Sequence, residues 1–223
     1  MILTRSIALL SFLVSQVTIA ISYYVALQYD HPKVESCNPF FGGCLNITDA
    51  GIYSPEGFIF RGGMIAACAF FIMWWIASFE RISIVVNKIT ILNSLSTLAG
   101  IVGAICLIVA TAVLIPPRDV INWDLHVAGA VLFFLVTFFA QLLHCSMYHF
   151  SNIKETLSKA SWITKVTTVV TQGIMIFIVL NKDSIPHGEE VGNAIEWWLA
   201  LLIAIYFLTG FWDWKEQPQV KQN

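Results

Sequence analysis

Four ionisable residues stand near the ends of long apolar segments, and their types could bind a charged group or move a proton: Glu56, Arg61, His126 and Glu196. Carboxylates and a guanidinium bind opposite charges, and an imidazole beside a carboxylate can serve as a general base. An ionised side chain is costly in an apolar medium, so each needs a compensating partner there. We therefore expect these four side chains to border one cavity. Glu196 is the expected ion-pair partner of Arg61, and Asp124 and Glu56 are the competing acids.

One apolar segment carries polar residues at steps of three and four, which is the spacing of a single helical face. This stripe consists of His126, Ala130, Phe133, Thr137, Gln141, His144 and Tyr148. Polar groups turned towards lipid are costly, so the stripe should face other helices, either as a hydrogen-bond network or as the wall of a ligand cavity. His126 and His144 are 18 residues apart, roughly 27 Å along a helix, so they cannot ligate one metal or haem iron. We expect no metal and no other cofactor.

The sequence offers little support for covalent catalysis. It contains no Ser-His-Asp, His-x-x-x-His or Gly-x-Ser-x-Gly pattern. An enzyme built on His126 would need a nucleophile or a metal within about 3 Å of the imidazole. We therefore predict no catalytic residue and favour a binding or regulatory protein. The polar stripe also leaves open a channel or a proton-coupled transporter.

The composition is that of a protein embedded in lipid. Of the 223 residues, 57% are hydrophobic and 12% are charged, and the mean hydropathy is +0.75. Apolar runs long enough to cross a bilayer recur along the chain. We predict an all-α polytopic membrane protein, a six-transmembrane helix bundle in a single domain (1–223), with spans at about 6–27, 57–79, 89–115, 125–148, 162–180 and 194–212. The net charge of −2 provides no basic surface for nucleic acid.

An even number of spans places both termini on one side of the membrane, and the distribution of basic residues favours the cytosol. In that orientation eight Lys and Arg residues lie inside (Arg5, Arg81, Lys88, Lys154, Lys159, Lys165, Lys215 and Lys221) and four outside (Lys33, Arg61, Arg118 and Lys182). A cleaved signal peptide is the alternative for the first segment, because a charged start is followed by an apolar run and small residues. That run continues to Leu27, which favours a span.

The longest connection, residues 28–56, is extracytosolic in this topology and contains Cys37 and Cys44. Outside the cytosol such a pair predicts a disulfide. A metal site is the weaker alternative, since only His31 lies nearby as a further ligand. Asn46-Ile47-Thr48 is an N-glycosylation sequon on the same side.

Local patterns predict how the helices begin and pack. Ser54 is suited to cap a helix whose first residue is Pro55, with Glu56 at its positive end. Small residues that allow helices to approach closely are Gly62, Gly63, Ala66, Ala67, Gly100 and Gly103. In the fifth span we expect interhelical hydrogen bonds from a face formed by Thr164, Thr168, Thr171 and Gln172.

Several motifs occur in order along nearly the whole chain. They are Thr48-Asp49-Ala50-Gly51, Ile52-Tyr53-Ser54-Pro55-Glu56, His126-Val127-Ala128-Gly129-Ala130, Leu143-His144-Cys145-Ser146-Met147-Tyr148, and Glu196-Trp197 with Tyr206, Thr209, Phe211 and Asp213. Together they resemble the damage-regulated autophagy modulator (DRAM) family of the FGF-receptor-activating/DRAM/Sfk superfamily. One departure is the tail after Asp213, which is too short for an obvious sorting or kinase-complex motif.

The resemblance implies six spans, cytosolic termini and residence in lysosomal, Golgi or plasma membranes. It also implies roles in autophagy, phosphoinositide-kinase recruitment or glycosylphosphatidylinositol (GPI) lipid remodelling, and no catalytic residue carries over. We therefore predict a non-enzymatic membrane regulator that binds a lipid headgroup, of an anionic phospholipid or a GPI lipid, in an outer-leaflet cavity. The alternative is a lipid-modifying enzyme or accessory factor in GPI-anchor lipid remodelling. A membrane-protein or kinase-complex partner is left open.

Overall fold

The computed structural model describes residues 2–29, 31, 34–86, 90–115, 120–151 and 153–214. All regular secondary structure in these residues is helical, which confirms the all-α prediction. The long helices are α1 (Ile2–Ala26), α3 (Glu56–Val86), α4 (Ile91–Ala112), α5 (Val120–Phe150), α6 (Lys159–Leu180) and α7 (Gly188–Leu208). Short elements are α2 (Pro39–Gly42), η1 (Ile153–Thr156), η2 (Lys182–Ser184) and α8 (Gly210–Asp213), the last of which continues α7.

Six helical segments in the described part of the chain are long and apolar enough to cross a membrane, as predicted. Their bounds differ from the predicted spans in both directions: α3 runs seven residues past Phe79 and α5 begins at Val120 rather than near Leu125, whereas α4 ends at Ala112 instead of near Ile115. Lys33, Lys88, Arg118, Lys215 and Lys221 of the charge argument lie outside the described residues, as does the side chain of Lys154. The assignment of the cytosolic side therefore stays a prediction.

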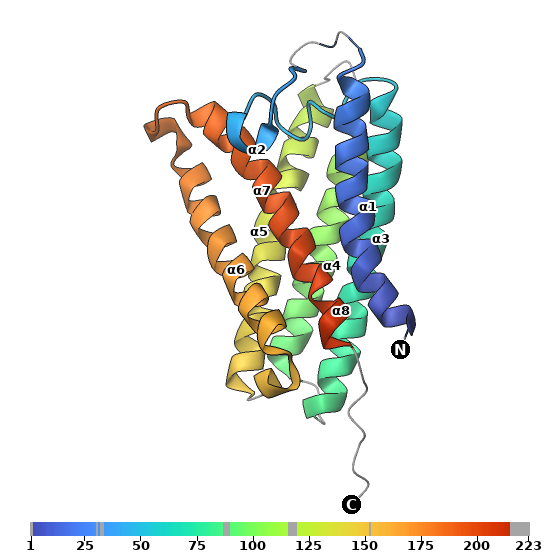
Figure 1. The fold of residues 1–223 in the computed structure, drawn as a ribbon, viewed down its shortest axis with the longest axis vertical. Coiled ribbons are helices and arrows are strands. Elements are labelled where there is room, and N and C mark those ends of the chain that lie inside the picture. The colour runs from blue at the N-terminus through green and yellow to red at the C-terminus, as the bar shows by residue number, and fades with distance from the viewer. Residues whose placement is uncertain are drawn as a thin grey trace, which may run out of the picture.

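The helices form one bundle in which neighbours in sequence are mostly neighbours in space (Figure 1). Helix α1 packs on α3, α3 on α4, and α4 on α5 along much of their lengths, while α6 lies against α7. Helix α7 returns to α1, and the Arg5 Nε–H of α1 donates to the Phe211 carbonyl of α8 at 3.2 Å. The start of α1 and the end of α8 therefore lie at the same end of the bundle. We call the opposite end, which carries the 28–56 loop, the outer end.

Helix α3 begins one residue later than predicted. Its first residue is Glu56, so Pro55 immediately precedes the helix and Ser54 is not its cap. The Gly57 N–H donates to the Tyr53 carbonyl at 2.6 Å, and the Phe58 N–H donates to the Pro55 carbonyl at 3.1 Å. Turn carbonyls thus satisfy the first amides, which is the function that a capping side chain would otherwise serve.

Small residues decide where the helices approach most closely. A Cβ on Gly63 would collide with Thr18 of α1, and one on Gly100 would collide with the Trp75 ring. By contrast, a Cβ on Gly62 would meet nothing within 4 Å among the described atoms. The prediction of close packing therefore holds for Gly63 and Gly100 and is wrong for Gly62.

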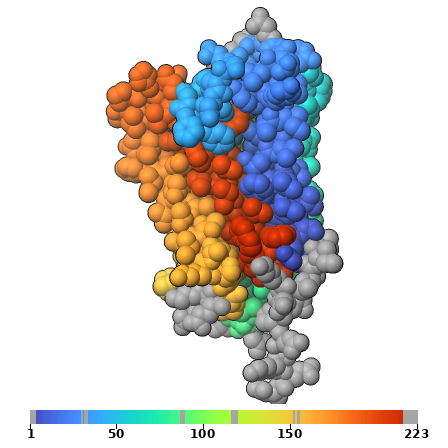
Figure 2. Space-filling view, viewed as in Figure 1, coloured from blue at the N-terminus to red at the C-terminus, as the bar shows by residue number. Residues whose placement is uncertain are grey.

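The outer loop folds back over the start of α7, where its light-blue segment covers part of α7 in the space-filling view (Figure 2). The predicted Cys37–Cys44 disulfide is present and closes a turn around α2. Two ring N–H groups of α7 hold this turn: Trp197 Nε1 donates to the Leu45 carbonyl and Trp198 Nε1 to the Phe40 carbonyl, each at 3.0 Å. The loop is thereby fixed against the helix that bears Glu196.

Candidate functional site

Two of the four outer candidates lie at the start of α3 and have partners there. The Glu56 side chain is fully buried, and its Oε1 is 3.2 Å from His31 Nε2. The His31 ring in turn stacks between Tyr29 and Tyr53, with centroids 5.6 and 4.9 Å away. Glu56 therefore belongs to a packed aromatic cluster of the outer loop.

Arg61 is half-buried one turn further along α3. Its Nη1–H donates to the Leu114 carbonyl at the end of α4 at 2.8 Å, and its guanidinium lies 5.3 Å from the Phe58 ring centroid. Within the described residues Arg61 forms no ion pair, and the expected pairing with Glu196 is wrong. The acceptor is thus a backbone carbonyl two residues past the end of α4.

His126 is buried near the outer end of α5. Its Nδ1 lies 2.8 Å from the Ala110 carbonyl, and its Nε2 lies 3.0 Å from Thr48 Oγ1. A carbonyl can only accept, so Nδ1 carries the proton and Nε2 accepts from the Thr48 hydroxyl. The imidazole thus joins the outer loop to α4 and α5, and both of its nitrogens are engaged.

His126 and Glu196 border the same pocket, whereas Glu56 and Arg61 do not. This pocket has a volume of about 310 Å³ and lies among α5, the α6–α7 connection and the outer loop. We call it the lateral pocket. Its polar wall comprises Asn46, Thr48, His126, Lys182, Asn193 and Glu196, and its apolar wall includes Val127, Ala130, Val131, Phe134, Val179 and Leu199.

The glycosylation sequon forms part of this wall. Asn46 lines the pocket, and its Oδ1 accepts from the Asp49 N–H at 2.7 Å. Thr48 is buried against His126. Glycosylation of Asn46 stays a prediction, and a glycan attached there would start inside the lateral pocket.

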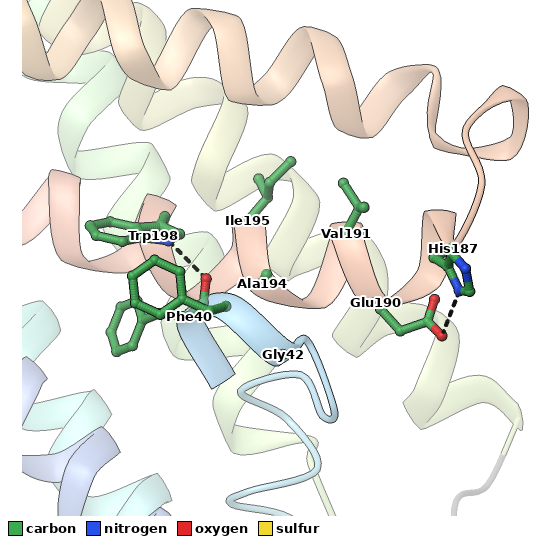
Figure 3. A pocket seen from close by; sticks show the side chains of 9 residues that line it. Phe40, Gly42, His187, Glu190, Val191, Ala194, Ile195 and Trp198 are labelled. Carbon is green, nitrogen blue, oxygen red and sulfur yellow. Dashed lines mark hydrogen bonds and ion pairs between the residues drawn. The ribbon is translucent and has the colours of Figure 1, made fainter. Parts of the chain in front are cut away.

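A second concavity, of about 560 Å³, lies between α2 and the first turns of α7 (Figure 3). Phe40, Trp198, Ile195 and Val191 line it, and at one end the His187 Nδ1 lies 3.5 Å from Glu190 Oε1. Its lining is mostly apolar and aromatic. Such a surface suits an interfacial belt, where aromatic side chains contact both lipid and water.

The polar stripe of α5 faces the bundle interior, as predicted: Thr137, Gln141, His144 and Tyr148 are buried. His144 Nδ1 lies 2.7 Å from the Tyr206 hydroxyl, and His144 Nε2 lies 2.9 Å from Ser78 Oγ. One turn away, the Gln172 amide donates to Gln141 Oε1 at 2.8 Å. These contacts tie α5 to α3, α6 and α7 through hydrogen bonds.

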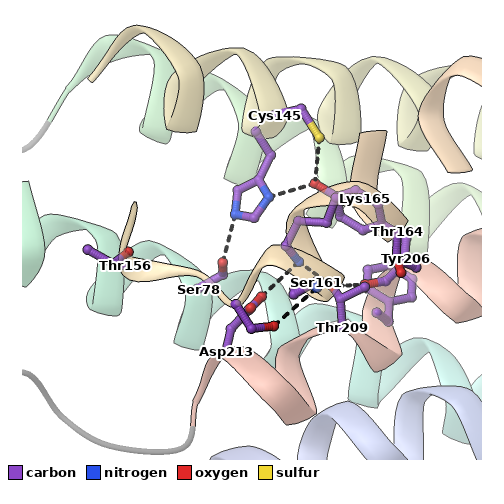
Figure 4. A network of polar contacts seen from close by, with 12 residues as sticks. Ser78, Cys145, Thr156, Ser161, Thr164, Lys165, Tyr206, Thr209 and Asp213 are labelled. Atoms are coloured by element: carbon purple, nitrogen blue, oxygen red, sulfur yellow. Dashed lines mark hydrogen bonds and ion pairs between the residues drawn. The ribbon is translucent and has the colours of Figure 1, made fainter. Parts of the chain in front are cut away.

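The same network contains a buried ion pair that the sequence interpretation missed (Figure 4). Lys165 Nζ lies 3.0 Å from Asp213 Oδ2, and the two side chains are 1% and 2% exposed. The Lys165 ammonium also donates to the Thr209 hydroxyl and lies 4.9 Å from the Tyr206 ring centroid. The charge count places Lys165 among the basic residues of the inner side, and the structure shows that its ammonium is buried in the bundle and paired with an acid.

A signal for this pair exists in the spacing. The buried polar residues of α6 are Ser161, Lys165, Thr168 and Gln172, at steps of four, three and four. The predicted face shares Thr168 and Gln172 with them, but Thr164 and Thr171 are only half-buried. Including Lys165 in the polar face of this span identifies the correct face.

No group of three or more His, Cys, Asp or Glu side chains in the described part of the chain is arranged to hold a metal ion. The fold and its sites therefore define a multi-pass helical membrane protein with a lateral pocket at one end and a buried polar network towards the other. The Frag1/DRAM/Sfk1/Cwh43P N-terminal domain model matches residues 4–217, so the chain belongs to this family. Searches of curated proteins and of solved structures give no match.

Proposed function

We propose that this chain is a non-enzymatic integral membrane regulator of the Frag1/DRAM type, and that its lateral pocket binds a lipid headgroup from the outer leaflet. The observation that carries the proposal is the composition of the pocket wall. Polar groups from the outer loop and from α7 gather around His126, while the deeper positions of α5 and α7 supply Ala130, Phe134 and Leu199. A lipid needs this combination, with polar partners for its headgroup beside an apolar surface for its chain.

The hydrogen bonds of His126 fix the pocket wall, and one of them also meets a requirement of the lipid-modifying alternative. A hydroxyl about 3 Å from an imidazole nitrogen is the arrangement of a nucleophile and its general base. Here Nδ1 donates to the Ala110 carbonyl and Nε2 accepts from Thr48. A backbone carbonyl rather than a carboxylate orients Nδ1, so the imidazolium that forms in catalysis would lack the stabilising acid of a catalytic triad at that nitrogen, which favours the regulator over the lipid-modifying alternative.

Blocking the pocket tests the proposal. Ala130 lines the pocket, whereas Ala128 lies two residues away on the same helix, is exposed and is not part of the wall. We expect Ala130→Trp to abolish the co-purification of a specific lipid, measured by native mass spectrometry of the full-length chain, and Ala128→Trp to leave it unchanged. Identical lipid profiles for wild type and both variants would refute the proposal.

The cellular role is proposed from family membership alone. We propose residence in lysosomal, Golgi or plasma membranes and a regulatory role in autophagy. Imaging of the tagged chain, together with autophagic flux measured in cells that lack it and in cells that carry Ala130→Trp, tests both statements. Normal flux in cells that lack the chain would contradict the autophagy role.

A further inference from the structure

The lateral pocket contains one cationic and one anionic side chain that do not pair with each other. Lys182 of η2 and Glu196 of α7 both line it. Among the residues that the structure describes, neither forms an ion pair with the other or with any third group. The Glu196 side chain accepts a hydrogen bond from the Ile47 N–H, and Asp49 is a second acid close to it. Two separated charges of opposite sign in one cavity suit a ligand that carries both.

The two charges lie at different depths. Helix α7 runs inward from the outer end, and Gly192 precedes Glu196 by one turn, about 6 Å along the axis. A Cβ on Gly188 would collide with the Lys182 carbonyl, and a Cβ on Gly192 would lie 3.4 Å from Lys182 Cδ, so the lysine side chain runs inward along α7 and has reached the level of Gly192 at its Cδ. Leu199 lies about one turn deeper than Glu196 and belongs to the apolar wall. From the outside inward, the order is therefore cation, anion, apolar surface.

Asn46 adds a donor to the pocket wall in the unglycosylated protein, because a glycan would occupy the same amide nitrogen. Its Oδ1 already accepts from the Asp49 N–H, so the amide nitrogen is the part left to donate into the cavity. Together with the Lys182 ammonium it can bind the oxygens of a phosphate, which charge-assisted donors stabilise most.

We infer that the pocket selects a lipid whose ammonium group lies next to its hydrocarbon chain and whose phosphate lies further out, that is, a phosphorylated long-chain amino alcohol. This inference rests on the proposed function and specifies its ligand. The chain contacts the apolar wall, the ammonium contacts Glu196, and the phosphate contacts Lys182 and Asn46. A phosphatidylethanolamine presents the reverse order, with its phosphate next to the chains and its ammonium outermost. It would place like charges together in this pocket.

The test is a binding series on the full-length protein in phosphatidylcholine nanodiscs, expressed without N-glycosylation. The probe is labelled sphingosine 1-phosphate, which carries both charges in the inferred order. The competitors are sphingosine, which lacks the phosphate, lysophosphatidic acid, which lacks the ammonium, and soluble phosphoethanolamine, which lacks the chain. We expect sphingosine 1-phosphate to bind at least about tenfold more tightly than either single-charge lipid, since one hydrogen bond to a charged group contributes about that factor. Phosphoethanolamine should not compete.

Charge-neutral variants assign each contact. Glu196→Gln should weaken binding of sphingosine 1-phosphate about tenfold and leave lysophosphatidic acid unaffected. Lys182→Gln should weaken both phosphate lipids and leave sphingosine unaffected. The controls are Glu189→Gln and Lys159→Gln, which remove exposed charges outside the pocket. A variant that misfolds would lose its affinity for all three lipids, whereas a variant that lacks one contact keeps its affinity for the lipid that does not use that contact.

The possible outcomes are distinct. Equal affinities for the three lipids, or no effect of Glu196→Gln on binding, would overturn the inference about the ligand. If lipid binding were still lost in Ala130→Trp, the proposed function would stand. Binding of every lipid that is insensitive to Ala130→Trp would overturn both. Tight competition by phosphoethanolamine would show that a soluble phosphate compound, rather than a lipid, is the ligand, and would likewise overturn the inference.

Discussion

The buried Lys165–Asp213 pair should be the most sensitive charged contact of the bundle. Both side chains are almost fully excluded from solvent, and the nitrogen–oxygen distance is 3.0 Å. Removing one partner from such a pair leaves an uncompensated buried charge and costs about 3 to 5 kcal/mol. For a domain of this size that corresponds to a decrease in Tm of roughly 6 to 20 °C.

The perturbations are Lys165→Met, which keeps the length of the side chain, and Asp213→Asn, which keeps its shape. We expect each single variant to lose most of that stability in a thermal unfolding assay on detergent-purified protein. The double variant Lys165→Met/Asp213→Leu removes both charges and should lie within about 1 kcal/mol of wild type, because apolar replacement of a whole buried pair is often neutral. Lys159→Met, an exposed charge at the start of the same helix, is the control.

The decisive quantity is the coupling energy between the two positions. A double-mutant cycle with the single variants Lys165→Met and Asp213→Leu should give a coupling of about 5 kcal/mol or more, because each single loss arises from the same contact and the double variant loses little. Single variants that unfold within 1 °C of wild type, or losses that simply add in the double variant, would refute the view that this pair is buried and mutually compensating.

Two further predictions concern helix contact and the outer loop. Gly100→Ala should destabilise the bundle by about 1 to 3 kcal/mol in the same thermal assay, because its Cβ would collide with the Trp75 ring. The control Gly62→Ala should cause no loss, because a Cβ there meets nothing within 4 Å among the described atoms. Equal effects of the two substitutions would contradict the assigned contact. Replacing Cys37 and Cys44 by Ser opens a short loop, for which the chain-entropy model gives a loss of about 2.5 kcal/mol. Faster hydrogen exchange of the loop amides should accompany that loss, and unchanged exchange would show that the contacts with α7 suffice to hold the loop.

Much of the bundle could be predicted because its signals are local. Apolar runs depend only on residues close in sequence, and they predicted the six long helices. The spacing of three and four in α5 is equally local, and it predicted the buried face that contains Gln141 and His144. The disulfide also follows from spacing within one loop. Helix ends were less accurate, since carbonyls of the turn at Tyr53 and Pro55 replaced the expected Ser54 cap.

The pairing of charges between helices could not be read in the same way. Arg61, Glu56 and Glu196 all stand near helix ends at the outer end, and the sequence gives their depth but not their direction around each helix axis relative to the neighbours. In the structure these directions separate them: Arg61 turns to α4, Glu56 to the outer loop and Glu196 to the lateral pocket. A shared depth is therefore not enough to infer a shared site.

The same limit explains Lys165. A lysine one or two turns inside the end of a span can extend to the interface or turn inward, and its position in the sequence is the same in both cases. What selects the inward orientation is Asp213, which the end of the last span brings to the start of α6. Because the compensating acid comes from a helix 48 positions away in the chain, only the packed bundle distinguishes a structural charge from one that sets topology. Tyr206 supports the same conclusion, because it contacts both Lys165 and His144 and so connects the ion pair to the polar stripe of α5.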